Sequence, residues 1–362
     1  MKFKYILTIS IIAVALVKYN GDAALVVDAT FTDPALQAAL GGTSGPVATT
    51  VYNELSKYAY VPELVKGFGN ANIYTSHAAT LRGYQGYDLF AVAIGTMVSV
   101  QAPSDDPQFY KKLQDDIDSG DVYAGVGFEP VVFQAGLNMS FLIDGLYVSF
   151  LFGKLHIDLD YGDFKLNHES SLIGGNINYA LFKEKSILAR SLLWRGITLQ
   201  TGYIHTDNSL VFYNKLDKST YSQSVSGFTV QYEIDPSVDF NLSTTSNVIP
   251  FEIYTGLRLL WVLNIGVGAG IDYVYSSSNS MKLSSAGDVE VIDDGAGGVS
   301  GYVGEKGKIT VDASTSGIKA DRYKKKLMAN VGLGLGPVFI DVPVSYYFDN
   351  GYAIGLTAGF VW

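Results

Sequence analysis

The end of the chain alternates between apolar and mostly small side chains. The apolar positions are Tyr352, Ile354, Leu356, Ala358, Phe360 and Trp362. Because successive side chains of a strand point to opposite faces, this pattern predicts a strand with one face against an apolar medium. A free edge of this kind would aggregate in a soluble protein, whereas closing a barrel pairs the last strand with the first.

The same alternation recurs upstream and predicts an antiparallel β-barrel. Asp349-Asn350-Gly351 predicts the last hairpin turn. Including weaker segments, we expect about twelve strands, within a range of 10 to 14. They are predicted at 87–100, 122–142, 146–161, 171–182, 195–214, 225–235, 238–246, 251–261, 264–275, 325–336, 338–348 and 352–362. Aromatic residues lie at both ends of the terminal hairpin, and ten tilted residues at ~3.3 Å each rise about 25 Å, the height of a membrane-spanning apolar band. The fold class is therefore all-β, a transmembrane antiparallel barrel.

The other face of these strands predicts the lining of a lumen. Its polar members are Glu252, Arg258, Asp272 and Asp341, which would set solute selectivity. Its glycines are Gly266, Gly268, Gly270, Gly332, Gly334 and Gly336. Glycine weakens a strand, so a run of glycines on one face indicates either the close approach of another backbone or tight strand curvature.

Residues 24–86 do not alternate. Asp33-Pro34 predicts a helix start and Gly41 its end, and a second helix is expected over 51–60. Gly67, Gly69, Gly83 and Gly86 are expected to break the chain before the first strand. We expect this partly helical segment to fold into the lumen as a plug, or to form a periplasmic segment.

The beginning of the chain has the pattern of a secretory signal peptide. Lys2 and Lys4 precede an apolar run over 5–17, and Gly21-Asp22-Ala23 offers small residues for cleavage after Ala23 or Ala24. The expected organisation is therefore a signal peptide at 1–23, a plug or periplasmic segment at 24–86 and a barrel at 87–362.

Composition supports contact with lipid and excludes several classes of function. The 362 residues include 25 Lys+Arg and 35 Asp+Glu, a net charge of −10, which argues against a nucleic-acid partner. Cys is absent, so neither disulfides nor thiolate metal sites can form. Charged residues make up only 17% of the chain, beside 25 Tyr and 39 Gly. Few charges with many Tyr and Gly favour a β-protein in a membrane.

The C-terminal pattern resembles the insertion signal of bacterial outer-membrane barrels. The residues that carry the resemblance are Tyr352, Ile354, Leu356, Phe360 and Trp362. The resemblance implies an outer-membrane location, outer-membrane lipid and the barrel-insertion machinery as partners, and a C-terminus on the periplasmic side. The turn at 349–351 would then face outward, and 276–324, rich in Ser, Gly and Asp, would be a long outside loop. Stretches such as 70–74 and 76–80 are similar in character to spirochaetal outer-membrane surface proteins.

Motifs for catalysis or metal binding are weak. The four His residues are not spaced as metal ligands, and no cofactor or metal is expected. His168-Glu169-Ser170 resembles the His-x-Ser pair of outer-membrane lipid hydrolases over three residues only, and we expect it in a solvated outside loop. A helix with an apolar stripe is expected over 106–120. The basic run 322–326 would either cap a strand in solvent or hold anionic lipid headgroups.

Two functions remain, and neither is enzymatic. The first is a porin-like channel, gated or plugged, for passive passage of small solutes, apolar ones among them. The second is a surface antigen that binds host or matrix molecules through its outside loops. The identity of the solute or extracellular ligand and the oligomeric state stay open at this stage.

Overall fold

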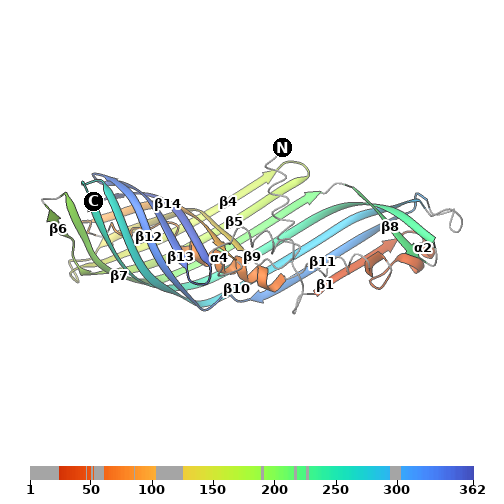
Figure 1. Ribbon diagram of the computed structural model, residues 1–362, viewed down its shortest axis with the longest axis horizontal. Coiled ribbons are helices and arrows are strands. Elements are labelled where there is room, and N and C mark those ends of the chain that lie inside the picture. The colour runs from red at the N-terminus through yellow and green to blue at the C-terminus, as the bar shows by residue number, and fades with distance from the viewer. Residues whose placement is uncertain are drawn as a thin grey trace.

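A closed ring of antiparallel strands forms one part of the molecule, and a sheet that continues past the ring forms the other (Figure 1). The computed structural model describes residues 24–45, 47–49, 52, 61–84, 86–102, 125–188, 191–215, 218–225, 228–293 and 303–362. The described strands are β1 (Ala24–Phe31), β2 (Phe90–Gln101), β3 (Gly125–Asn138), β4 (Leu146–Asp160), β5 (Phe164–Phe182), β6 (Lys185–Leu188), β7 (Leu192–Lys215), β8 (Ser219–Val225), β9 (Phe228–Leu259), β10 (Leu263–Asp293), β11 (Lys306–Ile318), β12 (Tyr323–Leu335), β13 (Val338–Tyr347) and β14 (Gly351–Val361). The described helices are α2 (Pro34–Leu40), α4 (Val61–Tyr74) and the short 3₁₀ turn η1 (Thr75–His77). The predicted signal peptide and the predicted helix at 106–120 lie outside the described residues, as does nearly all of 51–60.

The ring confirms the predicted barrel. Its order is β10-β12-β13-β14-β2-β3-β4-β5-β7-β9, and β9 pairs with β10 to close it. The last strand pairs with the first strand of the ring from Gly351↔Gln101 to Val361↔Ala91. Ten strands are the lower limit of the predicted range. Twelve was too many because the separate strands expected at 225–235, 238–246 and 251–261 are one continuous strand, β9.

The prediction of a long outside loop at 276–324 is wrong. Strand β10 continues to Asp293 and pairs with β9 as far as Gln231, while β11 and β1 extend the sheet beyond it. Strand β9 has 32 residues, which corresponds to about 100 Å of extended chain and far exceeds the membrane-spanning band. Within β10, Ser284, Ser285 and Asp288 occupy strand positions, and alternate apolar residues such as Val289 and Val291 are buried. We call the part formed by β1, α2, β8, β11 and the distal halves of β9 and β10 the extension.

The first residues of the predicted plug segment lie in the extension and not in the lumen. Strand β1 pairs with β11, and α2 packs in the same apolar cluster as β1. Helix α2 begins as predicted, because the Asp33 side chain accepts hydrogen bonds from the backbone N–H groups of Ala35 and Leu36 at 2.8 and 2.9 Å. Gly41 is its C-cap.

Residues 61–84, which we call the inner segment, pack against the inward face of the ring. A side chain at Gly127 would come within 2.5 Å of the carbonyl oxygen of Ala71, and one at Gly125 would collide with the backbone of Gly67. The predicted break at Gly67 and Gly69 is wrong, because α4 continues through both residues. Glycine at Gly67, Gly125 and Gly127 lets helix and strand backbones approach closely.

The outward face of the ring is apolar and bears aromatic residues at both ends. Ile354 and Leu356 on β14 are each 51% exposed, and Trp362 is 60% exposed. Near the 349–351 turn, Tyr346 packs against both Phe348 and Tyr352; at the opposite end, Phe360 stacks on Trp362. This arrangement matches the lipid-facing band and aromatic girdles of membrane barrels. None of the described helices is both long and apolar enough to span a bilayer.

Candidate functional site

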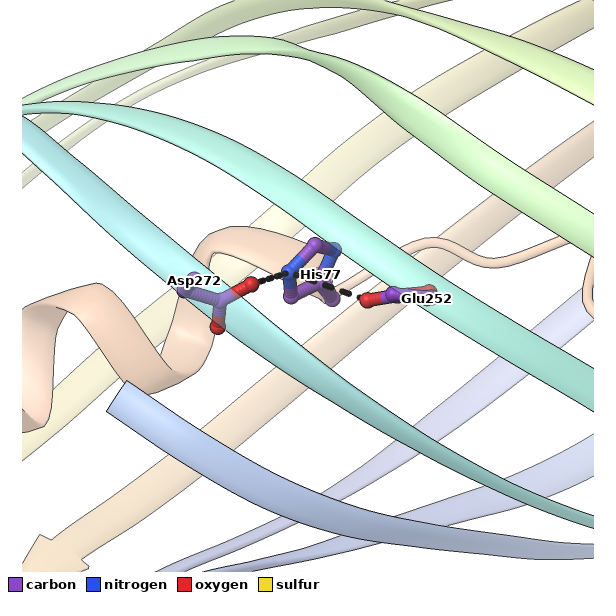
Figure 2. Close-up of side chains that lie close together, drawn as sticks. All are labelled: His77, Glu252 and Asp272. Atoms are coloured by element: carbon purple, nitrogen blue, oxygen red, sulfur yellow. Dashed lines mark hydrogen bonds and ion pairs between the residues drawn. The ribbon is translucent and has the colours of Figure 1, made fainter. Parts of the chain in front are cut away.

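Five buried charged or ionisable side chains join the inner segment to the wall of the ring. Lys326 of β12 donates from Nζ to Glu252 Oε1 at 2.6 Å, to Asp272 Oδ1 at 2.7 Å and to His77 Nε2 at 2.8 Å. Arg82 donates from Nε to Glu252 Oε2 at 2.6 Å and reaches Oε1 with its terminal nitrogen. Figure 2 shows the His77 ring between the carboxylates of Asp272 and Glu252. We call these five residues the lumen cluster.

The lumen cluster is balanced in charge. Each of its residues is no more than 5% exposed, so none of the charges is hydrated as it would be at the surface. Arg82 and Lys326 supply two positive charges, and Glu252 and Asp272 supply two negative ones. His77 accepts the Lys326 proton at Nε2, which assigns its own proton to Nδ1 and leaves the ring neutral. Buried charges persist only when paired in this way, and removing one partner leaves another uncompensated.

The cluster also has a donor set that could bind a metal ion. One ligand atom each from His77, Glu252 and Asp272 lie within 4.8 Å of one another, all of them buried. The ammonium of Lys326, however, lies within hydrogen-bond distance of all three residues. A cation is therefore already present where a metal would bind. The site therefore joins the inner segment to the wall of the ring through ion pairs and hydrogen bonds.

Aromatic and polar contacts also attach the inner segment to the ring on both sides of the lumen cluster. Tyr74 stacks on Tyr347 with ring centroids 3.9 Å apart, and its hydroxyl donates to Gln101 Oε1 at 2.5 Å. Tyr84 stacks on Phe339 at 3.8 Å. Such pairs contribute about 0.5–1.5 kcal/mol each beyond the area they bury. The inner segment is thus held at Tyr74 and Tyr84 as well as at the lumen cluster.

Asp321, in the link between β11 and β12, holds the middle of α4. It forms an ion pair with Lys66 at 2.7 Å and accepts from Lys324 at 3.1 Å. Asn70 Nδ2 also donates to Asp321 at 3.2 Å. Partial burial alone would raise the pKa of Asp321, but Lys66 and Lys324 hold that pKa below its ordinary value.

The structure brings together three of the predicted lumen-facing polar residues with the inner segment. Glu252 and Asp272 belong to the lumen cluster, and Asp341 lies 3.3 Å from the Tyr84 hydroxyl. Arg258 is only half-buried and lines a hollow at the C-terminal end of the ring with Arg195 and Glu184.

The glycines that were predicted to face the lumen have three different surroundings in the structure. Gly332 faces the inner segment, since a side chain there would meet the Tyr84 hydroxyl at 2.5 Å. The neighbouring strand β9 fills the space beside three others, Gly266, Gly268 and Gly270. Tyr254 lies closest to Gly266, Tyr254 and the Ile253 carbonyl to Gly268, and the Phe251 carbonyl to Gly270. Gly334 lies beside Asn264 Nδ2 at 3.1 Å. Gly336 was predicted to face the lumen but lies exposed in the β12–β13 turn with φ +64°, a backbone conformation that favours glycine.

Two further predictions about polar residues need correction. His168-Glu169-Ser170 lies within β5 and not in a loop, and Ser170 donates to Glu129 at 2.7 Å. No described contact joins His168 to Ser170. In the basic run at 322–326, Lys324 and Lys326 point inward and are at most 1% exposed. These two lysines therefore cannot hold lipid headgroups; they pair with carboxylates inside the ring.

Three members of the lumen cluster were not predicted from the sequence: His77, Arg82 and Lys326. The sequence could have indicated that Lys326 faces inward. It lies on the same face of β12 as Gly332, since the two residues are separated by an even number of positions. His77 and Arg82 lie in a segment without alternation, so nothing in the local pattern indicates which way they point.

An apolar pocket of about 250 Å³ lies between α4 and the strands. Phe68 and Asn72 contribute from α4, and Phe128, Ile157 and Leu210 contribute from three different strands. The pocket borders an apolar cluster built from Val65, Phe68 and the inner faces of β5, β7, β9 and β10. A concave apolar site of this type suits a small ligand.

A closed ring with a lipid-facing exterior and a polar, filled interior defines an outer-membrane β-barrel protein. The family model described as Lsa36-like matches residues 28–362, so the chain belongs to the Lsa36-like family. This agrees with the predicted resemblance to spirochaetal outer-membrane surface proteins. No curated protein matches the chain.

Several solved structures are similar to the chain at low identity. The translocator domain of autotransporter NalP from Neisseria meningitidis has a TM-score of 0.30 and 8% identity, covering 82% of this chain and 93% of that one. The Ralstonia pickettii toluene transporter TbuX has a TM-score of 0.28 and 8% identity, covering 82% and 99%. The Acinetobacter baumannii outer membrane protein Omp33 has a TM-score of 0.26 and 10% identity, covering 77% and 100%.

Proposed function

We propose that this protein is an outer-membrane channel for passive passage of small solutes, apolar ones in particular, with its lumen plugged by residues 61–84. One observation carries the proposal: an apolar pocket is lined jointly by the inner segment and the barrel wall. A wall that only supports a plug needs complementary packing, whereas a concave apolar space at their boundary suits a passing or bound solute.

The charges inside the ring support passage of apolar solutes over passage of ions. Glu252 and Asp272 would attract cations if they lined a water-filled pore. They are instead neutralised by Arg82 and Lys326. A segment fixed across the lumen by this cluster opposes a steady flow of ions but leaves apolar space beside it.

Uptake of a radiolabelled hydrocarbon tests this function. Cells of a bacterial host that produce the protein should take up toluene several-fold faster than cells that produce an unrelated closed barrel at the same level. The surface level of each protein is measured in parallel by protease protection. Equal uptake by both cell types would contradict the proposal.

The extension favours a second candidate function, binding of host or matrix molecules. It has its own apolar core, which includes Val27, Leu36 and Val311, and it lies beyond the ring (Figure 1). Binding of the purified protein to immobilised matrix proteins tests this candidate. Antibody fragments against residues 306–318 should block the binding, and fragments against the β12–β13 turn at 335–338 should not.

Export and insertion complete the proposal. Removal of residues 1–23 would release the mature chain to the periplasm, and the insertion machinery would recognise the strand that ends in Phe360 and Trp362. In this orientation the C-terminus faces the periplasm and the extension projects from the cell.

A further inference from the structure

A hollow of about 210 Å³ lies at the C-terminal end of the ring, where Tyr84 of the inner segment meets the wall. Two arginines line it, Arg195 of β7 and Arg258 of β9. Their guanidinium groups lie close enough to repel each other. Because neighbouring like charges are unfavourable unless an opposite charge balances them, the hollow needs negative charge.

Arg195 is the arginine that already has partners. Its Nη1 pairs with Glu184 Oε2 at 3.1 Å, and its Nη2 donates to Asn264 Oδ1 at 3.3 Å. Its Cζ atom also lies 5.8 Å from the centre of the Tyr84 ring, within the range of a cation–π contact. These contacts fix the guanidinium of Arg195 at one side of the hollow.

A bulge in β7 accounts for the position of Arg195. The pairing of β7 with β9 shifts between Trp194 and Ile197, so that Arg195 and Gly196 together oppose Gly256. Gly196 has φ +77°, a backbone conformation that favours glycine. A bulge re-aims the side chains beside it, and here it brings Arg195 to the hollow.

Arg258 and Asn264 supply hydrogen-bond donors that have no acceptor. The two residues lie directly opposite each other on β9 and β10, so their side chains occupy the same face of the sheet. Asn264 is 4% exposed, and its Nδ2 has no hydrogen-bond partner among the described residues. Arg258 Nε is also buried without a partner, and no described carboxylate forms an ion pair with this arginine. Since buried donors are rarely left unpaired and both residues line the hollow, an acceptor is expected there.

The charges that line the hollow leave one positive charge unmatched. Glu184 balances Arg195, with which it pairs, and leaves Arg258 without a counter-ion. Asp88 also lines the hollow, but it is exposed and forms no ion pair with a described residue, so water screens its charge. A guanidinium binds the two oxygens of a carboxylate through two parallel hydrogen bonds. A doubly charged phosphate would instead add a second negative charge beside Glu184 and Asp88.

The size and the walls of the hollow limit the ligand to a small molecule. Its volume of about 210 Å³ exceeds the roughly 150 Å³ of a cavity that holds benzene. Trp261, Phe339 and Trp362 line it as well and offer ring surface to the carbon part of a ligand. A carboxylate of the size of benzoate or smaller therefore fits.

We infer that this hollow binds a small, singly charged carboxylate, with Arg258 and Asn264 as its donors. The inference goes beyond the proposed function, because it assigns a charged ligand to the end of the ring and not an apolar solute to the pocket beside α4. The ligand balances Arg258 as Glu184 balances Arg195.

Fluorine NMR of 4-fluorobenzoate tests the site. The protein is purified in an uncharged detergent, and the line width of the probe is followed during a titration at constant ionic strength. We expect saturable broadening that an excess of acetate reverses. The alcohol 4-fluorobenzyl alcohol, which has a similar shape but no charge, should show no saturable broadening. Equal behaviour of the two probes would overturn the inference, because it would mean partition into the micelle.

Two variants remove the site in different ways. Arg258→Gln removes the unmatched charge, whereas Asn264→Asp supplies a carboxylate from the chain itself and keeps the acceptor for Arg195. Each should weaken the binding of 4-fluorobenzoate at least tenfold. Lys185→Gln is the matched control, because Lys185 is an exposed cation of β6 next to Glu184 in the chain and does not line the hollow. It should bind the probe as the natural protein does, and heat-modifiable migration verifies that each variant is folded.

Competing anions decide the class of ligand. At pH 8, where inorganic phosphate is mostly doubly charged, phosphate should displace the probe at least tenfold less well than acetate does. Displacement by phosphate as strong as that by acetate would overturn the assignment to a carboxylate. Unchanged binding in Arg258→Gln or Asn264→Asp, or equal weakening in Lys185→Gln, would overturn the site itself.

Discussion

At the scale of single residues, Lys326 has the largest expected effect. Lys326→Met removes the ammonium that contacts Glu252, Asp272 and His77, and leaves an uncompensated negative charge in a buried site. Removing one partner of a buried ion pair costs about 3–5 kcal/mol. We expect the free energy of unfolding in detergent, measured by heat-modifiable migration and tryptophan fluorescence, to fall by that amount.

Lys325 provides the matched control for Lys326. It is the preceding residue on the same strand, but its side chain is exposed on the outward face. Lys325→Met should change the free energy of unfolding by less than about 1 kcal/mol, as is usual for surface charges. Equal losses in the two variants would contradict the role assigned to the lumen cluster.

Gly332 tests the packing of the inner segment against the wall. An alanine methyl group there would meet the Tyr84 hydroxyl at 2.5 Å and collide with Asp341. Overpacking of this kind costs about 1–3 kcal/mol. We expect Gly332→Ala to lower the midpoint of thermal unfolding more than Gly334→Ala, where the nearest atom is 3.1 Å away. The reverse order would mean that Tyr84 does not hold this position.

At the scale of elements, alternation predicted the short ring strands well and failed for the longest. Strands β12, β13 and β14 lie where the pattern placed them, because each has one face in lipid and one inside. Pro236 and Pro250 lie between the three segments expected in place of β9, and proline is disfavoured inside a paired strand. The pairing of β9 with β7 passes over Pro250, and the register on both sides of that residue is the same.

Strand β3 pairs with β4 only from Val132 to Asn138, so among the described residues 125–131 have a strand partner on the β2 side alone, and this predicts uneven hydrogen exchange. Amide hydrogens at 127–129 should exchange with solvent faster than those at 132–138, because only the latter lie in the part of β3 that is paired on both sides. Uniform exchange along β3 in the natural protein would contradict the absence of a partner beside 125–131.

The Asp321 link predicts a dependence on pH. Because the folded-state pKa of Asp321 is lowered, its contribution to stability is present above the ordinary Asp value of about 3.9 and is lost as pH falls through the lower folded value. The side chain is 44% exposed, so the contribution should stay below about 1 kcal/mol. Asp321→Asn should remove this acid-range component from unfolding curves measured between pH 7 and pH 3.

Asp312 supplies the comparison for Asp321. It lies exposed on β11, and the structure shows no ion pair for it among the described residues. Asp312→Asn should leave the acid-range component in place. If both variants lose it, the pH dependence does not come from the attachment of α4.

At the scale of the whole molecule, the sequence predicted the barrel but not the contacts inside it. The lumen cluster combines His77 and Arg82 with Glu252, Asp272 and Lys326, which are far apart in the chain and meet only when the ring closes. Local periodicity cannot pair such residues, because it reports which face a side chain occupies and not what it faces. The extension was missed for a related reason. Its strands are rich in Ser, Gly and Asp, which are typical of loops, and the sequence does not show that the apolar residues between them are buried.

Current recording in planar bilayers tests most directly whether the lumen is closed by residues 61–84. The account predicts that the intact protein conducts almost no ions and that Lys326→Met, which weakens the lumen cluster, produces clear openings, whereas Lys325→Met stays silent. A large, steady ion current through the intact protein would contradict the account, because an open aqueous pore cannot coexist with a segment fixed across it.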